Sequence, residues 1–144
     1  MVAALNDTFA PAIRFDADDR QDNAIIVARN IDVTFKVEHG MVAAVKDISF
    51  QLYRGETIAI VGESGSGKSV TARTVMGLLT KRATVAKSAV VRFNGDDILK
   101  FSSRKRRALR GNRISMIFQE PMSSLNPIYT IGSQIVDAIR VHSK

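Results

Sequence analysis

The chain has 144 residues, of which 45% are hydrophobic, and a formal net charge of +7. This length gives room for one folded domain with its own core, and the absence of cysteine excludes disulfides and thiolate metal sites. No apolar run approaches the roughly 18 residues of a membrane-spanning helix, and the amino terminus lacks a signal-peptide pattern, so the sequence predicts a soluble or peripheral protein.

The charge is unevenly distributed along the chain. Residues 1–23 are acidic and weakly patterned, which predicts a disordered leader. Positions 81–113 hold eleven Lys and Arg against two Asp. The basic run at residues 104–107 fits either a surface that binds nucleic acid or a solvated helix face. No aromatic side chain is interleaved with it to stack on bases, so we expect no nucleic-acid partner.

The first predicted elements are two strands. Residues 24–35 and 42–52 are rich in β-formers, and residues 38–40 between them have the composition of a turn. This pattern predicts an antiparallel hairpin. Residues 54–55 (Arg-Gly) then turn the chain into a short apolar strand over residues 56–61.

The strongest motif follows that strand directly. Residues 62–69 have the pattern G-x-x-x-x-G-K-S, typical of a loop whose backbone N–H groups wrap a polyphosphate. Lys68 is expected to reach the β- and γ-phosphates, and the Ser69 hydroxyl to bind Mg²⁺. A flexible Gly/Ser turn is the alternative, but it does not require the strand before or the helix after. The predicted nucleotide site comprises Gly62, Glu63, Ser64, Gly65, Ser66, Gly67, Lys68 and Ser69.

Helices and strands alternate beyond the loop. A helix is expected to begin near Gly67, with apolar residues at helical spacing over residues 70–79. Residues 89–93 predict a strand that ends at the turn pair Asn94-Gly95. Ser102 or Ser103 is expected to cap a short basic helix that ends near residues 110–111.

The last third of the chain predicts one more strand and one more helix. Residues 113–118 are apolar enough for a buried strand, which would deliver Gln119 to the sheet end where sites in open α/β sheets lie. Residues 122–126 lie between two prolines and are expected to be irregular. Residues 131–141 predict an amphipathic helix. The elements together predict an α/β fold, a phosphate-loop core with an amino-terminal antiparallel β subdomain.

At this point the sequence resembles a known family, the ATP-binding subunits of ABC transporters, in particular those of dipeptide, oligopeptide and glutathione importers. The matching stretches are residues 61–69 and 117–127, and the resemblance extends from about residue 24 to the carboxyl end. It implies ATP and Mg²⁺ as ligands and a peripheral position on the cytoplasmic face of the inner (plasma) membrane. It also implies that ATP binding and hydrolysis are coupled to peptide transport.

The resemblance implies further roles for individual residues. Gln119 would approach the Mg²⁺ and the attacking water and would sense the γ-phosphate. The segment Glu120–Pro127 would contact the transmembrane permease subunits, although a loop without a partner is the alternative. Phe35 would stack on adenine, although a core position suits it equally well. A second ATP-binding subunit would complete the nucleotide sandwich.

The sequence departs from the family's pattern in its acids. A complete ATPase of this class needs an Asp at the end of an apolar strand, followed by a Glu that polarises water. The acids beyond Lys68 are Asp96, Asp97, Glu120 and Asp137. Only Glu120 follows an apolar strand, and Gln119 stands where the Asp is needed. The family's Leu-Ser-Gly-Gly-Gln signature is also absent. We therefore expect residues 24–144 to form the amino-terminal half of an ABC ATP-binding domain that is hydrolysis-deficient alone; a non-catalytic fragment or interaction module is the alternative.

Overall fold

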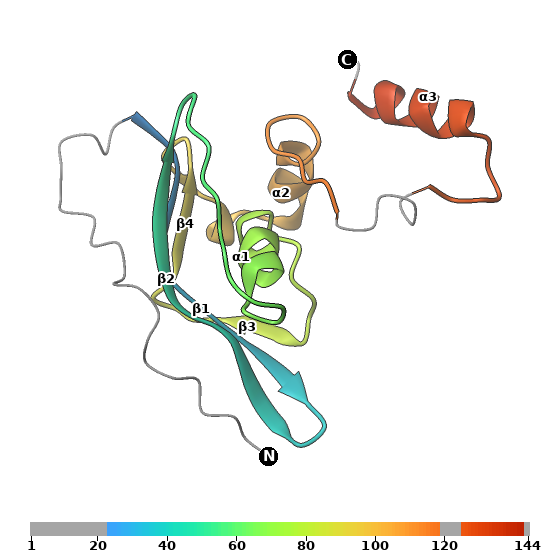
Figure 1. Cartoon of the computed structure of the whole chain (residues 1–144). Coiled ribbons are helices and arrows are strands. Elements are labelled where there is room, and N and C mark those ends of the chain that lie inside the picture. Colours follow the sequence, from blue (N-terminus) through green and yellow to red (C-terminus); the bar gives the residue numbers. More distant parts are fainter. Residues whose placement is uncertain (1–22, 119–124, 143–144) are drawn as a thin grey trace. The chain divides into compact units, whose positions relative to one another are not determined.

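The computed structural model describes residues 23–118 and 125–142 (Figure 1). The chain forms two compact units, residues 1–100 and residues 101–144. The predicted leader over residues 1–23 therefore lies outside the described residues, except for Asn23. In the described ranges no helix combines the length and the apolarity that crossing a membrane requires.

A long antiparallel hairpin organises the first unit, as predicted. Strand β1 (Ala24–Val37) pairs with strand β2 (Gly40–Tyr53) through a turn at residues 38–39. Two non-glycine residues in these strands, Asn30 and Asp47, have positive φ angles of 51° and 48°. Their N–H groups donate to the side chains of Ser49 (2.9 Å) and Asp32 (3.1 Å). These bonds satisfy backbone groups where the register of the two strands shifts.

Strand β1 also pairs along its other edge, so it lies inside a five-stranded sheet with the order β2-β1-β4-β5 (Figure 1). Strand β4 (Val90–Phe93) pairs with one end of β1, and strand β3 (Ala83–Val85) pairs with the other end. The predicted strand over residues 89–93 is thereby confirmed, whereas the three residues of β3 are too few to show a pattern. The turn pair Asn94-Gly95 has φ angles of 48° and 86° and leads into β5 (Asp96–Asp97), as its composition predicts.

One face of this sheet forms the core together with helix α1 (Lys68–Val75). Ala28, Ile31 and Val33 of β1 are fully buried, as is Val91 of β4. Helix α1 buries two hydroxyl groups here, and each is satisfied within the helix. Thr71 Oγ1 donates to the Gly67 carbonyl at 3.1 Å, and Thr74 Oγ1 donates to the Val70 carbonyl at 2.7 Å.

Helix α1 is shorter than its sequence pattern predicts, because glycine ends it. The apolar spacing continues to residue 79, but Gly77 takes a φ of 61° directly after the cap residue Met76. The Gly77 N–H donates to the Thr74 carbonyl (3.0 Å), and the Leu78 N–H donates to the Arg73 carbonyl (2.8 Å). These two bonds satisfy the last carbonyls of the helix in the Schellman arrangement.

Two predicted strands are wrong in this structure. Residues 56–61 and residues 113–118 form no regular strand, and the latter contain only an isolated bridge from Arg110 to Ile114. Most of their apolar side chains are exposed, by 89% at Val61 and 92% at Ile117. A strand exists only where a neighbouring strand accepts its hydrogen bonds, and no described segment pairs with either range to form one. Apolar composition alone therefore does not produce the strand.

The second unit contains the two predicted helices, α2 (Ser103–Leu109) and α3 (Ile131–His142). Ser102 caps α2, because its Oγ accepts the Lys105 N–H at 3.3 Å. The Lys105 ammonium lies 3.8 Å from the centroid of the Phe101 ring, a cation–π contact. Both helices confirm their predictions, and α3 extends one residue further than expected.

Candidate phosphate-binding site

The glycine-rich loop turns sharply between the irregular residues 56–61 and helix α1. Gly65 and Gly67 have φ angles of 82° and 90°, values that L side chains rarely adopt. A turn bond from the Ser66 N–H to the Glu63 carbonyl, at 3.2 Å, tightens the loop. The backbone therefore requires glycine at Gly65 and Gly67 for conformational reasons.

Gly67 is required for a second reason, the close approach of strand β2. A Cβ atom at this position would lie 2.4 Å from the Ala44 carbonyl oxygen and 3.2 Å from Val45 Cγ2. The first of these is a backbone atom, which cannot rotate away. The loop is therefore seated directly on β2, and the sheet fixes the start of α1. The sequence motif gives no indication of this contact, because Ala44 contributes only its backbone.

Lys68 bends back over the loop. Its ammonium group donates to the Gly62 carbonyl at 2.7 Å, to the Glu63 carbonyl at 2.6 Å and to Ser66 Oγ at 3.2 Å. An ammonium group has three donors, and here each of them has an oxygen of the loop as its partner. The charge of Lys68 is thus held above the loop, where a phosphate oxygen can take the place of these partners.

The amino terminus of α1 points its N–H groups into the same region. Its cap residue, Gly67, has no side chain to accept these hydrogen bonds. The first backbone N–H groups of a helix have no partner within the helix, and the helix dipole adds partial positive charge at this end. Helix termini of this kind bind phosphate. Ser69, in the first turn, is exposed and presents its hydroxyl at the same end.

These features fit Mg·ATP. The loop has no room for a side chain at Gly67, and it combines backbone donors, one ammonium group and one hydroxyl. Among the described residues no group of three or more His, Cys, Asp or Glu could hold a metal ion. Mg²⁺ is commonly held by few protein ligands together with phosphate oxygens and water, which agrees with one hydroxyl, that of Ser69.

Phe35, the predicted adenine contact, lies near the end of β1 and is half-buried. The sheet brings this part of β1 near the loop. Val45, which Gly67 approaches, is paired with Val33, and Phe35 follows two residues later, about 7 Å along the strand. The structure thus places Phe35 in the same region of the sheet as the loop.

Gln119, the predicted metal and water contact, lies outside the described residues, as do Glu120 and the positions up to residue 124. The remainder of the predicted permease contact, residues 125–127, is held by Gln134 of α3. Gln134 Oε1 accepts the Asn126 N–H at 2.9 Å, and Gln134 Nε2 donates to the Asn126 carbonyl at 3.0 Å. Sequence reasoning assigned no role to Gln134.

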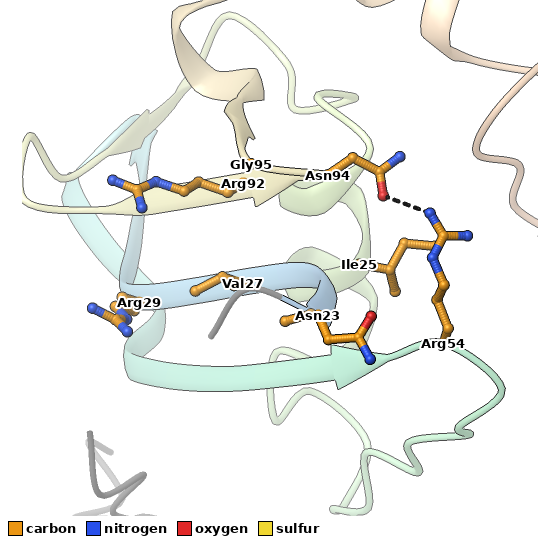
Figure 2. Close-up of a pocket in the computed structure, with 9 residues that line it drawn as sticks. Asn23, Ile25, Val27, Arg29, Arg54, Arg92, Asn94 and Gly95 are labelled. Atoms are coloured by element: carbon orange, nitrogen blue, oxygen red, sulfur yellow. Dashed lines mark hydrogen bonds between the residues drawn. The ribbon is translucent and has the colours of Figure 1, made fainter. Parts of the chain in front are cut away.

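The first unit also contains a cavity of about 340 Å³, whose lining residues are drawn in Figure 2. Its lining comes from Asn23 and β1, from β4 with the turn that follows it, and from Arg54. No residue of the range 62–69 contributes to it. It is therefore distinct from the phosphate-binding site.

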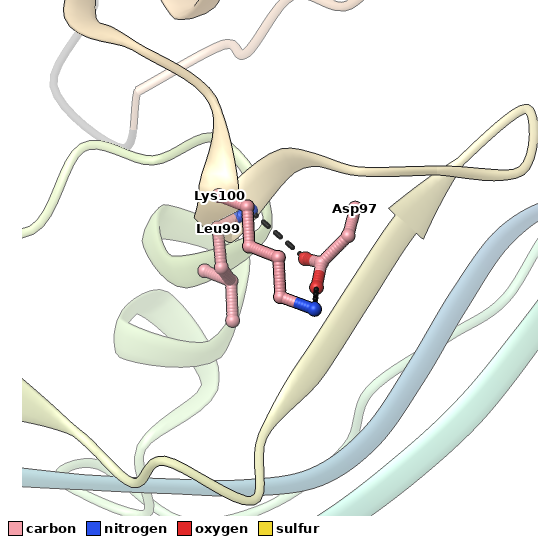
Figure 3. A network of polar contacts seen from close by, with 3 residues as sticks. All are labelled: Asp97, Leu99 and Lys100. Atoms are coloured by element: carbon pink, nitrogen blue, oxygen red, sulfur yellow. Dashed lines mark hydrogen bonds and ion pairs between the residues drawn. The ribbon is translucent and has the colours of Figure 1, made fainter.

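Asp97 is one of the acids considered above for the catalytic Asp and Glu. In the structure it has a structural role instead (Figure 3). Its Oδ1 accepts the Leu99 N–H at 3.1 Å, and its Oδ2 lies 3.3 Å from the Lys100 ammonium. These contacts stabilise the short helix η2 (Ile98–Lys100) that follows β5. This agrees with the expectation that Asp97 does not follow a strand of the kind that delivers a catalytic acid.

Comparison with known proteins is consistent with this geometry. Residues 45–143 match the family described as ABC transporter. The dipeptide transport ATP-binding protein of Bacillus subtilis is 44% identical over 120 residues, which are 83% of this chain and 36% of that protein. The oligopeptide transport ATP-binding protein of Salmonella typhimurium is 46% identical over 83% of this chain and 35% of its own length. The glutathione import ATP-binding protein of Shigella flexneri is 41% identical over 88% and 21%. The chain thus spans about a third or less of the length of these relatives.

Proposed function

Because the chain belongs to the ABC transporter family, we propose that it is the ATP-binding component of a peptide importer. The observation that carries the proposal is the contact between the loop and strand β2. Gly67 lies against the backbone of β2, and the ammonium of Lys68 is held over the loop. Loop glycine, ammonium, hydroxyl and helix terminus converge on one anion-binding region. The names of the relatives support ATP as the nucleotide and peptides as the transported class.

The residues of the loop have different roles in nucleotide binding. Backbone N–H groups of the loop and of the first turn of α1 hold phosphate oxygens, since no side chain intervenes at Gly65 or Gly67. Lys68 exchanges its loop partners for phosphate oxygens, and Ser69 supplies a ligand to Mg²⁺. Phe35 stacks on the adenine ring. When bound, Mg·ATP supplies a phosphoanhydride whose cleavage powers transport in this class of protein.

We further propose that this chain by itself does not activate water for hydrolysis. Asp97 is engaged with Leu99 and Lys100, and Asp137 lies within helix α3. The resemblance to the family assigns the orientation of the metal and the water to Gln119, which carries an amide. An amide cannot take a proton from water as a carboxylate can, so turnover is expected to be negligible.

The proposed partners are transmembrane permease subunits and a second ATP-binding subunit. Residues 120–127 form the proposed permease contact, at the cytoplasmic face of the membrane. Support comes from the part of the segment that the structure describes, where Gln134 binds both backbone groups of Asn126. The exposed residues Ile131, Ile135 and Ile139 of α3 follow directly and offer an apolar surface beside it.

The test is titration calorimetry with Mg·ATP on the purified chain and on two variants that each lose one positive charge. Lys68→Ala removes the ammonium above the loop, and a charged hydrogen bond of this kind contributes roughly 1.5–3 kcal/mol. The affinity should fall about tenfold to a hundredfold. Lys87→Ala, which changes an exposed lysine outside the loop, is the control and should leave the affinity unchanged.

Two results would contradict the proposal in separable ways. Equal affinity of the chain and of Lys68→Ala would show that the loop does not hold the phosphates. If the chain released phosphate at enzymatic rates and Lys68→Ala abolished this release, the proposed lack of hydrolysis would be refuted. The proposed nucleotide site in the loop would still stand.

A further inference from the structure

The cavity on the solvent face of the sheet is lined by three arginines, Arg29, Arg54 and Arg92 (Figure 2). The strand register shows which face this is. Ala28 pairs with Val91, and both are fully buried in the core. Val27 pairs with Arg92, so these residues and Arg29 project from the opposite face. Arg29 and Arg92 therefore lie on the side of the sheet that the core does not use.

No acidic side chain lines this cavity. Asp97 of β5 pairs with Arg92 in the sheet, but its carboxylate is engaged by the Leu99 N–H and the Lys100 ammonium. Within residues 23–118 and 125–142, no ion pair joins a carboxylate to any of the three guanidinium groups. Arg54 Nη2 is 3.4 Å from Asn94 Oδ1, an uncharged acceptor. Arg29 and Arg92 occupy diagonal positions on adjacent strands, where like charges repel.

The charges are spread along the cavity rather than focused on one point. Figure 2 shows Arg29 and Arg92 towards one end and Arg54 with Asn94 towards the other. The distance along β1 from Ile25 to Arg29 is roughly 13 Å. The half-buried side chains of Ile25 and Val27 lie between the two ends. A single phosphate cannot reach both ends, whereas an extended peptide with several carboxylates can.

We propose that this arginine-lined cavity binds an extended acidic peptide, and that its occupant is residues 16–22 of the same chain. These residues contain four Asp and one Arg, a net charge of −3 that complements the three arginines. They join directly to Asn23, which itself lines the cavity. Their extended length is up to about 20 Å, enough to double back along β1 and reach both ends. Direct attachment gives an effective concentration of about millimolar, which favours several weak ion pairs acting together.

The test uses the absence of native cysteine, which allows one spin label to be attached at one chosen position. The full chain with Ala17→Cys carries a nitroxide, and paramagnetic broadening of backbone amides is measured by NMR. We expect severalfold stronger broadening at residues 27–29 and 91–92 than elsewhere in the sheet. The broadening should disappear in about 1 M salt, where the Debye length is near 3 Å.

Matched charge variants separate this site from general attraction. Arg29→Gln with Arg92→Gln should remove the broadening, whereas Arg82→Gln with Lys87→Gln removes the same charge elsewhere in this unit and should preserve it. Broadening that survives both high salt and loss of the two cavity arginines would overturn the proposal. So would an absence of broadening combined with shifts at Arg29 and Arg92 on adding inorganic pyrophosphate, since the site would then take a free anion.

Discussion

The substitution Gly67→Ala probes the contact on which the candidate site rests, and Gly65→Ala is its matched control. Both glycines have positive φ angles of similar size, 90° and 82°. Alanine at either position is therefore strained by about 1–2 kcal/mol. The surroundings differ, because a Cβ at Gly67 would lie 2.4 Å from the Ala44 carbonyl oxygen, whereas a Cβ at Gly65 would meet nothing within 4 Å.

The difference between the two variants isolates that contact. Forcing an extra methyl group against packed atoms costs typically about 1–3 kcal/mol. Alanine also lowers the conformational entropy of the unfolded chain, by a similar amount at both positions, so this contribution cancels in the comparison. We expect Gly67→Ala to lower the free energy of unfolding by about 1–3 kcal/mol more than Gly65→Ala does.

The assay is equilibrium unfolding in urea, with the slope of the transition checked for equality between the two variants. Equal slopes allow the shift in midpoint to be interpreted as a change in stability. If Gly67→Ala were no less stable than Gly65→Ala, the loop would not be seated on β2, and the positioning of α1 by the sheet would be refuted.

Three further substitutions test the elements around the site. Ser102→Ala removes the side-chain cap of α2 and should lower stability by about 1 kcal/mol, measured by urea unfolding with circular dichroism; an unchanged midpoint would argue against the cap. Gly77→Ala places a Cβ at a φ of 61° and should cost about 1–2 kcal/mol, whereas a stabilised variant would contradict the glycine stop at the end of α1. Asp97→Asn weakens one ion pair, whose Lys100 side chain is exposed, and should change stability by less than about 1 kcal/mol without altering nucleotide affinity; reduced Mg·ATP binding would show that Asp97 belongs to the site.

Local chemistry explains what could be predicted of the fold. The hairpin of β1 and β2, the turn Asn94-Gly95 and the Ser102 cap each depend on residues adjacent in the sequence. The residues 56–61 and 113–118 were predicted as strands from composition alone, and they form none. Strand formation depends on a neighbour distant in sequence, and no composition of the strand itself supplies one.

In the candidate site too, the features set by adjacent residues could be predicted and those set by distant residues could not. The motif in residues 62–69 predicts which side chains and glycines contact phosphate, because those requirements are local. The contact between Gly67 and the carbonyl of Ala44 is not local and involves no side chain of Ala44. Likewise, Arg29 and Arg92 are far apart in sequence, and only the pairing of β1 with β4 brings them to one cavity.

Mapping Mg·ATP onto the backbone amides by NMR tests the central claim most directly, and a chain of 15.8 kDa is small enough for complete amide spectra. A loop seated on β2 and joined to the amino terminus of α1 predicts saturable shifts centred on residues 65–70, with smaller shifts at Phe35 and Ala44 and none at Arg29 or Arg92. Saturable shifts confined to the arginine-lined cavity, with residues 65–70 unmoved, would contradict the assignment of the nucleotide to this loop.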